Sequence, residues 1–518
     1  MKNQRKLFAA LLAGALLLSM VACGQTAQPS GGSSSGDQSA GSSAPQTTPG
    51  LVTTAAGQIQ GTEENGVYQY LGVPYAQATE RFVPAGVVEP WEGVLKADAY
   101  GNISPQGAIL GMGGGDVGEG TDNNCQNLNI WTPGLGNSEK RPVMVWLHGG
   151  GFSMGSANDE LYDGKNLSRG GDVVVVGVNH RLNLFGHLDL SAYGEKYKDS
   201  ANVGLSDIVA ALQWIQENIE QFGGDPDNVT VFGQSGGGAK VLALMTTPYA
   251  QGLFHKGIVQ SGATETMGVT FTSKEASAKL TERILSNLGI TADNIEEIQT
   301  VSANSLMDAS VQALQDTAEE FQIPASLSEG YAMEWGPVID GDYMPTNPVT
   351  EDSFAAAGQD IPLLIGSNLN EWTHFMGGPQ SNMTNAAVEA FAQAYPNMEP
   401  SEAPYVDTFI RLPMLKIMSH KADQGGAPVF AYVLAIGNAY HGAEIPYVFA
   451  NIDQSLAEQI SQAWVSFART GTPGADTLPQ WEPYNRENGA TMILENQSEL
   501  VYGHDKQLMA LLAPDYDY

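Results

Sequence analysis

The sequence predicts an α/β fold with a large, mostly parallel central sheet, helices on both faces and a helical lid region. Short runs of apolar and β-branched residues recur along the chain, and such runs are typical of strands buried on both faces of a parallel sheet. Segments with helical periodicity alternate with these runs, which favours a single α/β domain. The chain has 518 residues, of which 42% are hydrophobic, so it can bury a substantial core.

The expected strands begin well inside the chain and are separated by helical segments. Residues 204–224 have apolar side chains at helical spacing, and Gly223 is expected to end that helix. Residues 263–360 are mostly of helical character, and an excursion of this kind commonly builds a lid over a ligand cleft. The expected strands are RPVMVWLHG (141–149), DVVVVGVNHR (172–181), NVTVFG (228–233), GIVQSG (257–262), IPLLIGS (361–367) and VFAYVLAI (429–436).

The N-terminus has the features of an export signal. Three basic residues precede an apolar run, residues 7–22, that is too short for a membrane-spanning helix. The run ends in SMVACGQ, which resembles a bacterial lipoprotein signal with Cys23 as the lipidated residue. We therefore expect residues 1–22 to be a signal peptide, and the protein to be exported and held at the cell surface or in the periplasm only by a lipid anchor.

A flexible tether is expected at residues 23–50, followed by one folded domain at residues 51–518. Residues 24–49 contain no Leu, Ile, Val, Met or aromatic residue and so cannot form a core. If Cys23 is lipidated, Cys125 has no partner for an intramolecular disulfide. Cys125 is then either a reactive thiol or, as we expect, a buried one.

Charge narrows the possible partners. Lys and Arg total 23 and Asp and Glu total 57, which gives a formal net charge of −34. Such a chain repels phosphate backbones and anionic lipid, so a nucleic-acid partner is not expected. The acidic residues could attract cationic ligands, but a solvated acidic surface is the simpler interpretation.

The pattern G-x-S-x-G occurs three times, around Ser34, Ser153 and Ser235. Ser34 lies in the tether, where nothing fixed can act as its base. Ser235 follows an expected strand and precedes a helix-forming run, which is the strand-turn-helix context of a nucleophilic serine. Glycines at positions 233 and 237 leave room for that strained turn. Ser235 is the predicted nucleophile, and an ordinary glycine-rich turn is the alternative.

The other parts of a serine hydrolase occur in the order that this chemistry requires. Ser153 closes HGGGFSMG, a loop whose consecutive glycines can turn backbone N–H groups toward an oxyanion, so this serine is not expected to be the nucleophile. Glu371 lies just beyond the expected strand at 361–367, and His441 just beyond 429–436, which we expect to be the final strand. The chain order Ser, acid, His follows.

From about residue 58 to residue 483, the chain resembles the type-B carboxylesterases, a family of cholinesterase-like and para-nitrobenzyl-esterase-like α/β-hydrolases. The resemblance implies the α/β-hydrolase fold, with Ser235 as nucleophile, Glu371 as the acid and His441 as general base. It also implies an oxyanion hole made by the N–H groups of Gly150, Gly151 and Gly236. The matching stretches are YLGVPYA (70–76), CQNLNIWTP (125–133), PVMVWLHGGGF (142–152), VNHRLNLFGHL (178–188), residues 202–238, YHGAEIPYVF (440–449) and WVSFARTGTP (464–473).

The chain departs from the family pattern at four positions. Gln234 and Gly236 stand where members usually carry Glu and Ala, and the loss of the Glu charge should weaken stabilisation of an imidazolium. Ser104 replaces a cysteine that usually forms a disulfide with the position of Cys125. Trp372 follows the acid where Gly is usual, which should narrow the pocket.

The predicted reaction is hydrolysis of a small apolar or aromatic ester through an acyl-enzyme, without metal or cofactor. The base must be neutral, so kcat/KM should fall in acid. Five aromatic residues near the catalytic positions are predicted to line the pocket, although core packing is an equal alternative: Phe152, Trp335, Trp372, Phe375 and Tyr440. A non-catalytic cholinesterase-like binding or adhesion protein is the rival function, and a hydrolase of bulky aromatic or polyol esters is a third possibility.

Overall fold

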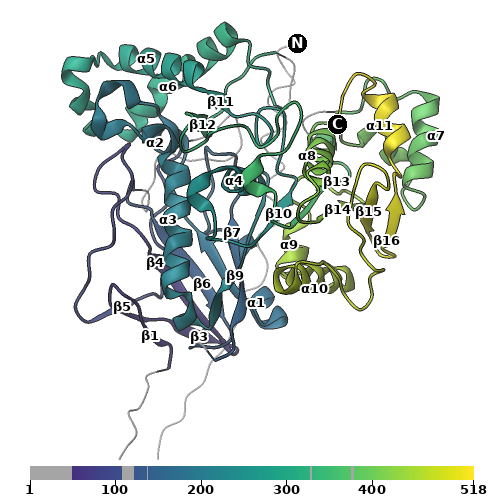
Figure 1. Ribbon diagram of the computed structural model, residues 1–518, viewed down its shortest axis with the longest axis horizontal. Helices are drawn as coiled ribbons and strands as arrows, with labels where there is room; N and C mark the ends of the chain where they lie inside the picture. The colour runs from purple at the N-terminus through teal and green to yellow at the C-terminus, as the bar shows by residue number, and fades with distance from the viewer. Residues whose placement is uncertain (1–48, 108–121, 137, 327–329, 375–377) are drawn as a thin grey trace, which may run out of the picture. The chain divides into compact units, whose positions relative to one another are not determined.

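Eleven strands form the central sheet of the computed structural model (Figure 1). The structure describes residues 49–107, 122–136, 138–326, 330–374 and 378–518. The expected signal peptide, Cys23, nearly all of the tether and Phe375 lie outside these residues. The strands, in spatial order, are β16 (Glu499–Tyr502), β15 (Ala490–Leu494), β14 (Val429–Leu434), β13 (Leu363–Asn368), β10 (Lys256–Gln260), β9 (Gly224–Gln234), β7 (Arg141–Leu147), β8 (Val174–Val178), β6 (Asn127–Thr132), β4 (Val67–Pro74) and β3 (Thr62–Glu64).

The centre of the sheet is parallel and its two edges are antiparallel. Every neighbouring pair from β8 to β15 in that spatial order is parallel. Strand β16 pairs antiparallel with β15, and β6, β4 and β3 continue the other edge antiparallel. The mostly parallel sheet is thus confirmed. The expectation that 429–436 forms the final strand is wrong, because β15 and β16 follow β14 in the chain.

Alternate side chains of the central strands enter two separate cores, one on each face of the sheet. In β7, Val143, Val145 and Leu147 pack into one core, and Met144 and Trp146 into the other. This alternation follows from the two-residue period of a strand and requires helices on both faces. The first core receives α3 (Val203–Asn218), α4 (Gly236–Thr246) and α8 (Arg411–Asp423), and the second receives α1 (Lys165–Gly171), α9 (Ile445–Val448) and α10 (Ser455–Thr470).

The helical excursion after β10 consists mainly of α5 (Lys274–Leu288) and α6 (Ala303–Phe321), which lie side by side (Figure 1). Ser273 and Ser302 cap their N-termini by accepting backbone N–H groups, and Gly289 in left-handed conformation ends α5. Their apolar faces form a third core with α2 (Asn183–His187). The helical character of this segment is confirmed, and its role as a lid over a cleft stays a prediction.

Smaller elements complete the described chain. One small sheet joins β1 (Leu51–Thr53), β2 (Gln58–Gln60) and β5 (Val94–Lys96), and another joins β11 (Thr272–Ser273) and β12 (Val338–Ile339). Helix α11 (Lys506–Leu512) packs beside α7 (Asn385–Ala394), as Figure 1 shows. Of the helices in the described ranges, none has the length and apolar character needed to cross a membrane.

Buried polar groups tie the loop after β8 to α3. Arg181 and Asp207 are both fully buried and form an ion pair at 2.6 Å, with Asp207 also accepting the backbone N–H of Arg181. Cys125 is a free, buried thiol, and its pKa is raised by that burial, as expected for an unreactive cysteine. Ser104, in the place of its usual partner, accepts the backbone N–H of Leu182 at 3.0 Å.

Candidate active site

Ser235 occupies a sharp turn between β9 and α4. Its φ of 56° and ψ of −128° lie in a region that residues with a side chain rarely adopt, and its N–H donates to the carbonyl of Gln260 at 2.8 Å. A Cβ at position 237 would overlap the carbonyl oxygen of Leu147, and one at position 233 would meet the backbone of Gly237 at 2.5 Å. Both glycines are therefore required by close backbone approach, as the sequence pattern predicted.

Glu371 and His441 form a short, buried hydrogen bond. Nδ1 of His441 lies 2.5 Å from Oε2 of Glu371, whose side chain is fully buried. The other carboxylate oxygen accepts the backbone N–H of Asn368 at 2.7 Å, and the backbone N–H of His441 donates to the Glu371 carbonyl at 3.0 Å. These contacts orient the ring and place the proton of a neutral imidazole on Nδ1, which leaves Nε2 as the basic nitrogen.

The basic nitrogen of His441 faces Gln234, the residue immediately before Ser235. The side-chain amide nitrogen of Gln234 lies 3.1 Å from Nε2 of His441. Among the described residues, no hydrogen bond joins the Ser235 hydroxyl to His441. The contact between the Ser235 turn and the imidazole is therefore made by Gln234. Catalytic hydrogen bonds are often incomplete before substrate binds, so this arrangement is compatible with a serine–histidine pair.

The glycine loop after β7 folds back over the start of α4. Gly150 and Gly151 have φ values of 89° and 62°, and the carbonyl of Gly150 accepts the N–H groups of Ser153 and Met154 in a tight turn. Gly236 is the first residue of α4, so its N–H has no partner within the helix. Within the described chain, the N–H groups at 150, 151 and 236 donate no hydrogen bond, so they are available to an oxyanion.

Two further buried carboxyl groups lie near Glu371. Burial and the charge of Glu371 raise the pKa of Asp407 well above the usual range for aspartate, and the same two causes raise the pKa of Glu444. Glu444 accepts hydrogen bonds from Asn368 at 2.6 Å and from Gln260 at 3.3 Å. Raised pKa values favour the neutral acids, which limits their repulsion of Glu371.

The predicted pocket residues lie in different environments. The Trp372 ring packs 4.2 Å from the His441 ring between centroids, and Tyr440 is 51% exposed beside it. Phe152 is buried and packs edge-on against Phe271, whereas Trp335 is buried in the core beneath α5 and α6. The structure thus brings Trp372 to the imidazole, whereas Tyr440 is adjacent to it in the chain. A substrate contact for any of these residues stays a prediction.

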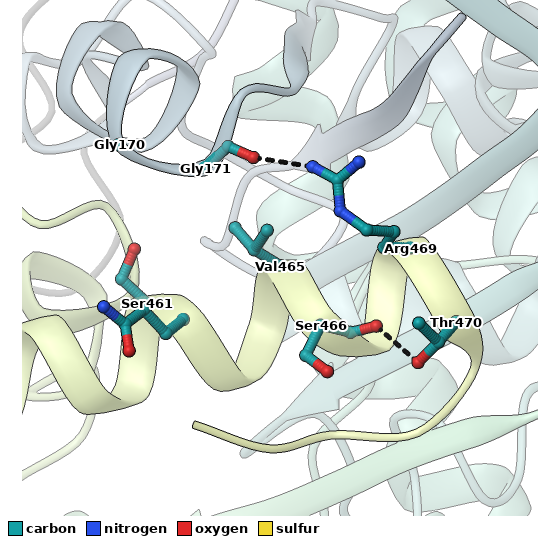
Figure 2. A pocket seen from close by; sticks show the side chains of 8 residues that line it. Gly170, Gly171, Ser461, Val465, Ser466, Arg469 and Thr470 are labelled. Atoms are coloured by element: carbon teal, nitrogen blue, oxygen red, sulfur yellow. Dashed lines mark hydrogen bonds between the residues drawn. The ribbon is translucent and has the colours of Figure 1, made fainter. Parts of the chain in front are cut away.

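A hollow of about 290 Å³ lies elsewhere, between α1 and α10 (Figure 2). It is lined by Val465, Ser466 and Arg469 among others, and the Arg469 guanidinium donates to the carbonyl of Gly171 at 2.9 Å. None of the predicted catalytic residues lines it. This hollow is therefore distinct from the site around His441.

Sequence reasoning missed three side chains of this region. Glu444 lies three residues after His441 in a quoted motif, and its position there is a signal that could have been used. Lys240 is a lone cation in the otherwise apolar run AKVLALM, which was a second available signal. Asp407 has no local pattern that distinguishes it from a surface aspartate.

Comparison with known proteins finds similar esterases along most of the chain. A model of the carboxylesterase family matches residues 48–399 and 393–510. The chain is 36% identical over 498 residues to para-nitrobenzyl esterase of Bacillus subtilis (strain 168), which covers 88% of this chain and 96% of the relative. It is 30% identical over 496 residues to fumonisin B1 esterase of Sphingopyxis macrogoltabida, with 86% of each chain covered.

Solved structures agree with these relatives. An esterase from Clostridium hathewayi, described as able to hydrolyze aliphatic aromatic polyesters, superposes with a TM-score of 0.80 at 35% identity. The match covers 90% of this chain and 98% of the solved one. A structure described as PNB esterase superposes with a TM-score of 0.72 at 33% identity, over 90% of this chain and 100% of the other.

Proposed function

The chain belongs to the carboxylesterase family, with the α/β-hydrolase fold and the activity of a carboxylesterase, and from this membership we propose that it acts through Ser235, His441 and Glu371. The observation that carries the proposal is the 2.5 Å bond between Glu371 and His441, held buried beside the strained turn of Ser235. A buried acid, an imidazole with its second nitrogen free of that acid, and a strained serine are the parts of a nucleophilic triad.

The proposed reaction has two halves. Nε2 of His441 removes the Ser235 proton as Oγ attacks the ester carbonyl, and the N–H groups of Gly150, Gly151 and Gly236 bind the resulting oxyanion. The tetrahedral intermediate expels the alcohol, which takes the proton from His441. Water then gives a proton to His441 and attacks the acyl group. As the second intermediate collapses, the bond to Oγ breaks and His441 returns the proton to Oγ, which releases the carboxylic acid and regenerates the serine.

We propose apolar or aromatic esters as the substrate class. The Trp372 ring packs on the catalytic imidazole, so aromatic surface borders the reacting centre, and the half-exposed Tyr440 directly precedes His441 in the chain. Similar proteins include a para-nitrobenzyl esterase and an esterase described as acting on aliphatic aromatic polyesters. Bulky aromatic or polyol esters are the third candidate class, and the similar proteins include a fumonisin B1 esterase.

The direct test is hydrolysis of p-nitrophenyl esters of increasing acyl length by wild type and Ser235→Ala. We expect turnover by wild type, a maximum of kcat/KM at one acyl length, and loss of at least about 10³-fold in Ser235→Ala. Equal rates in the two proteins would refute the role of Ser235. A non-catalytic binding protein, the rival, predicts no turnover and is not favoured, because the similar proteins include several esterases.

We also propose that the protein is exported as a lipoprotein anchored through Cys23. The support is the basic and apolar N-terminal sequence, which ends in SMVACGQ. Expression in a bacterial host with labelled palmitate should label wild type and leave Cys23→Ala unlabelled. Release of the full-length protein from membranes without any acyl label would contradict the anchor.

A further inference from the structure

Lys240 is a fully buried lysine on α4, one and a half turns beyond Ser235. Lysine is almost never fully buried unless its ammonium is paired, because removing a charge from water is costly. The partners of this side chain therefore indicate why the cost is tolerated.

Those partners are two carbonyl groups of the glycine loop. Nζ of Lys240 donates to the carbonyl of His148 at 2.8 Å and to the carbonyl of Gly151 at 2.9 Å. The two carbonyls belong to the residues at either end of the segment 148–151, which carries the proposed oxyanion donors at 150 and 151. One ammonium thus holds both ends of the three-glycine run, in addition to the tight turn at the Gly150 carbonyl.

The charge of Lys240 acts on three neighbouring imidazoles. These imidazoles come from three different segments, His148, His180 and His187, and burial together with the Lys240 charge lowers the pKa of each, so all three are neutral. The Phe152 ring is a further neighbour, and its centroid lies 5.5 Å from Nζ. Among the described residues, no carboxylate shifts the pKa of Lys240.

We propose that Lys240 is a positioning residue of the oxyanion hole, whose ammonium holds the glycine loop so that its N–H groups face the reacting carbonyl. The inference rests on the proposed function and adds a residue that the triad does not contain. A protein can keep a buried charge without a counter-charge, at a cost in folding stability, where that charge is needed for the function of the site. The positive charge is held against the loop that carries the proposed oxyanion donors, and such a charge stabilises a developing oxyanion more than the neutral ester.

The hold depends on protonation. Burial lowers the pKa of Lys240 to about 7, so the ammonium is present below this pH and is lost above it. A neutral amine donates weaker hydrogen bonds and has no charge. We therefore expect kcat to fall on the alkaline side, as Lys240 deprotonates, in addition to the fall in acid as the catalytic imidazole is protonated.

The test compares Lys240→Met and Lys240→Gln with wild type, using p-nitrophenyl butyrate between pH 5 and 9 and correcting for spontaneous hydrolysis. Met keeps the length of the side chain without donors, and Gln keeps N–H donors without charge. We expect kcat to fall roughly tenfold to a hundredfold in Lys240→Met, with KM within about threefold and an intermediate kcat in Lys240→Gln. The alkaline decline should disappear in both variants.

Lys421→Met is the matched control. Lys421 is also fully buried, donates to a backbone carbonyl, that of Gln359, and lies 6.0 Å from a phenylalanine ring, but it is on α8 and does not contact the glycine loop. This variant should keep the alkaline decline and nearly all of kcat, whatever its loss in melting temperature.

Three results overturn the inference, and none depends on the others. A folded Lys240→Met with kcat within twofold of wild type removes the positioning role. Persistence of the alkaline decline in that variant removes the dependence on Lys240 protonation. If the variant does not fold, a wild-type kcat that stays flat from pH 7 to 9 refutes the inference by itself. Failure of the proposed function differs from all three, because wild type then shows no Ser235-dependent hydrolysis.

Discussion

The side-chain amide of Gln234 lies 3.1 Å from Nε2 of His441, on the side of the ring opposite the 2.5 Å bond to Glu371. The imidazole is therefore held between a carboxylate and a neutral amide. Related enzymes usually carry Glu at this position, so this protein has one negative charge fewer beside the imidazole. This difference concerns the ring nitrogen that exchanges the proton, and its effect should appear in the pH dependence of catalysis.

Gln234→Glu is predicted to move the acidic limb of kcat/KM to higher pH. A carboxylate at 3 Å favours the protonated imidazole, so a larger fraction of the enzyme has lost its base at a given acid pH, and the shift should be about one pH unit. The measurement is kcat/KM for one p-nitrophenyl ester from pH 4.5 to 8. Gln312→Glu, which adds the same charge at an exposed position of α6, should leave the limb in place. An unmoved limb in Gln234→Glu would mean that residue 234 does not face the imidazole during turnover.

Glu371→Gln is predicted to lower kcat by about 10³–10⁴-fold with little change in KM, because an amide no longer orients the imidazole or stabilises its charged form. Steady-state kinetics near neutral pH provide the measurement. The control is Glu402→Gln, which alters a second histidine–glutamate pair, His374 and Glu402 at 3.0 Å, outside the proposed triad. Comparable losses in both variants would contradict a specific role for Glu371.

Gly236→Ala is predicted to lower kcat at least about tenfold, although alanine is usual here in the family. A Cβ at position 236 would overlap the carbonyl oxygen of Gly151, which Lys240 also holds, so the glycine loop must move. Gly170→Ala is the control, because a Cβ there meets nothing within 4 Å. Unchanged kcat in Gly236→Ala would show that the loop adjusts without loss of the oxyanion donors.

Asp207→Asn is predicted to destabilise the fold by about 3–5 kcal/mol, because it leaves the fully buried Arg181 with an unpaired charge. Urea unfolding measures this free energy. Asp172→Asn breaks a pair of the same 2.6 Å length with Arg141, but the Asp172 side chain is 60% exposed, so its loss should cost less than about 1 kcal/mol. A loss below about 1 kcal/mol in Asp207→Asn would contradict the structural role of the buried pair.

The pattern of apolar runs predicted the parallel centre of the sheet because those strands are buried on both faces and so appear as continuous apolar runs. The edges were missed for the opposite reason. Strand β3 is fully exposed and β15 is a short run within a long polar segment, so neither stands out from its surroundings. The wrong expectation of a final strand at 429–436 follows directly from missing β15.

At the site, the glycines that the backbone requires could be predicted from the sequence, but the contacts of the polar side chains could not. A glycine at 237 can be predicted from the turn because its cause, close approach of the chain before and after the serine, is local. The contact of Lys240 with the carbonyls of His148 and Gly151 joins positions about 90 residues apart, and only packing brings them together. The same holds for Gln234 and His441. The sequence showed that Gln replaces the usual Glu at position 234, but not that this side chain faces Nε2 of His441.

The central claim is that Ser235 is the nucleophile, and covalent labelling tests it most directly. Wild type, Ser235→Ala and Ser153→Ala are incubated with a fluorophosphonate and examined by intact-mass and peptide mass spectrometry. We predict a single adduct on Ser235 in wild type and in Ser153→Ala, with loss of ester hydrolysis in step with labelling, and no adduct in Ser235→Ala. An adduct on another residue that abolishes hydrolysis, or full hydrolysis by Ser235→Ala, would contradict the account.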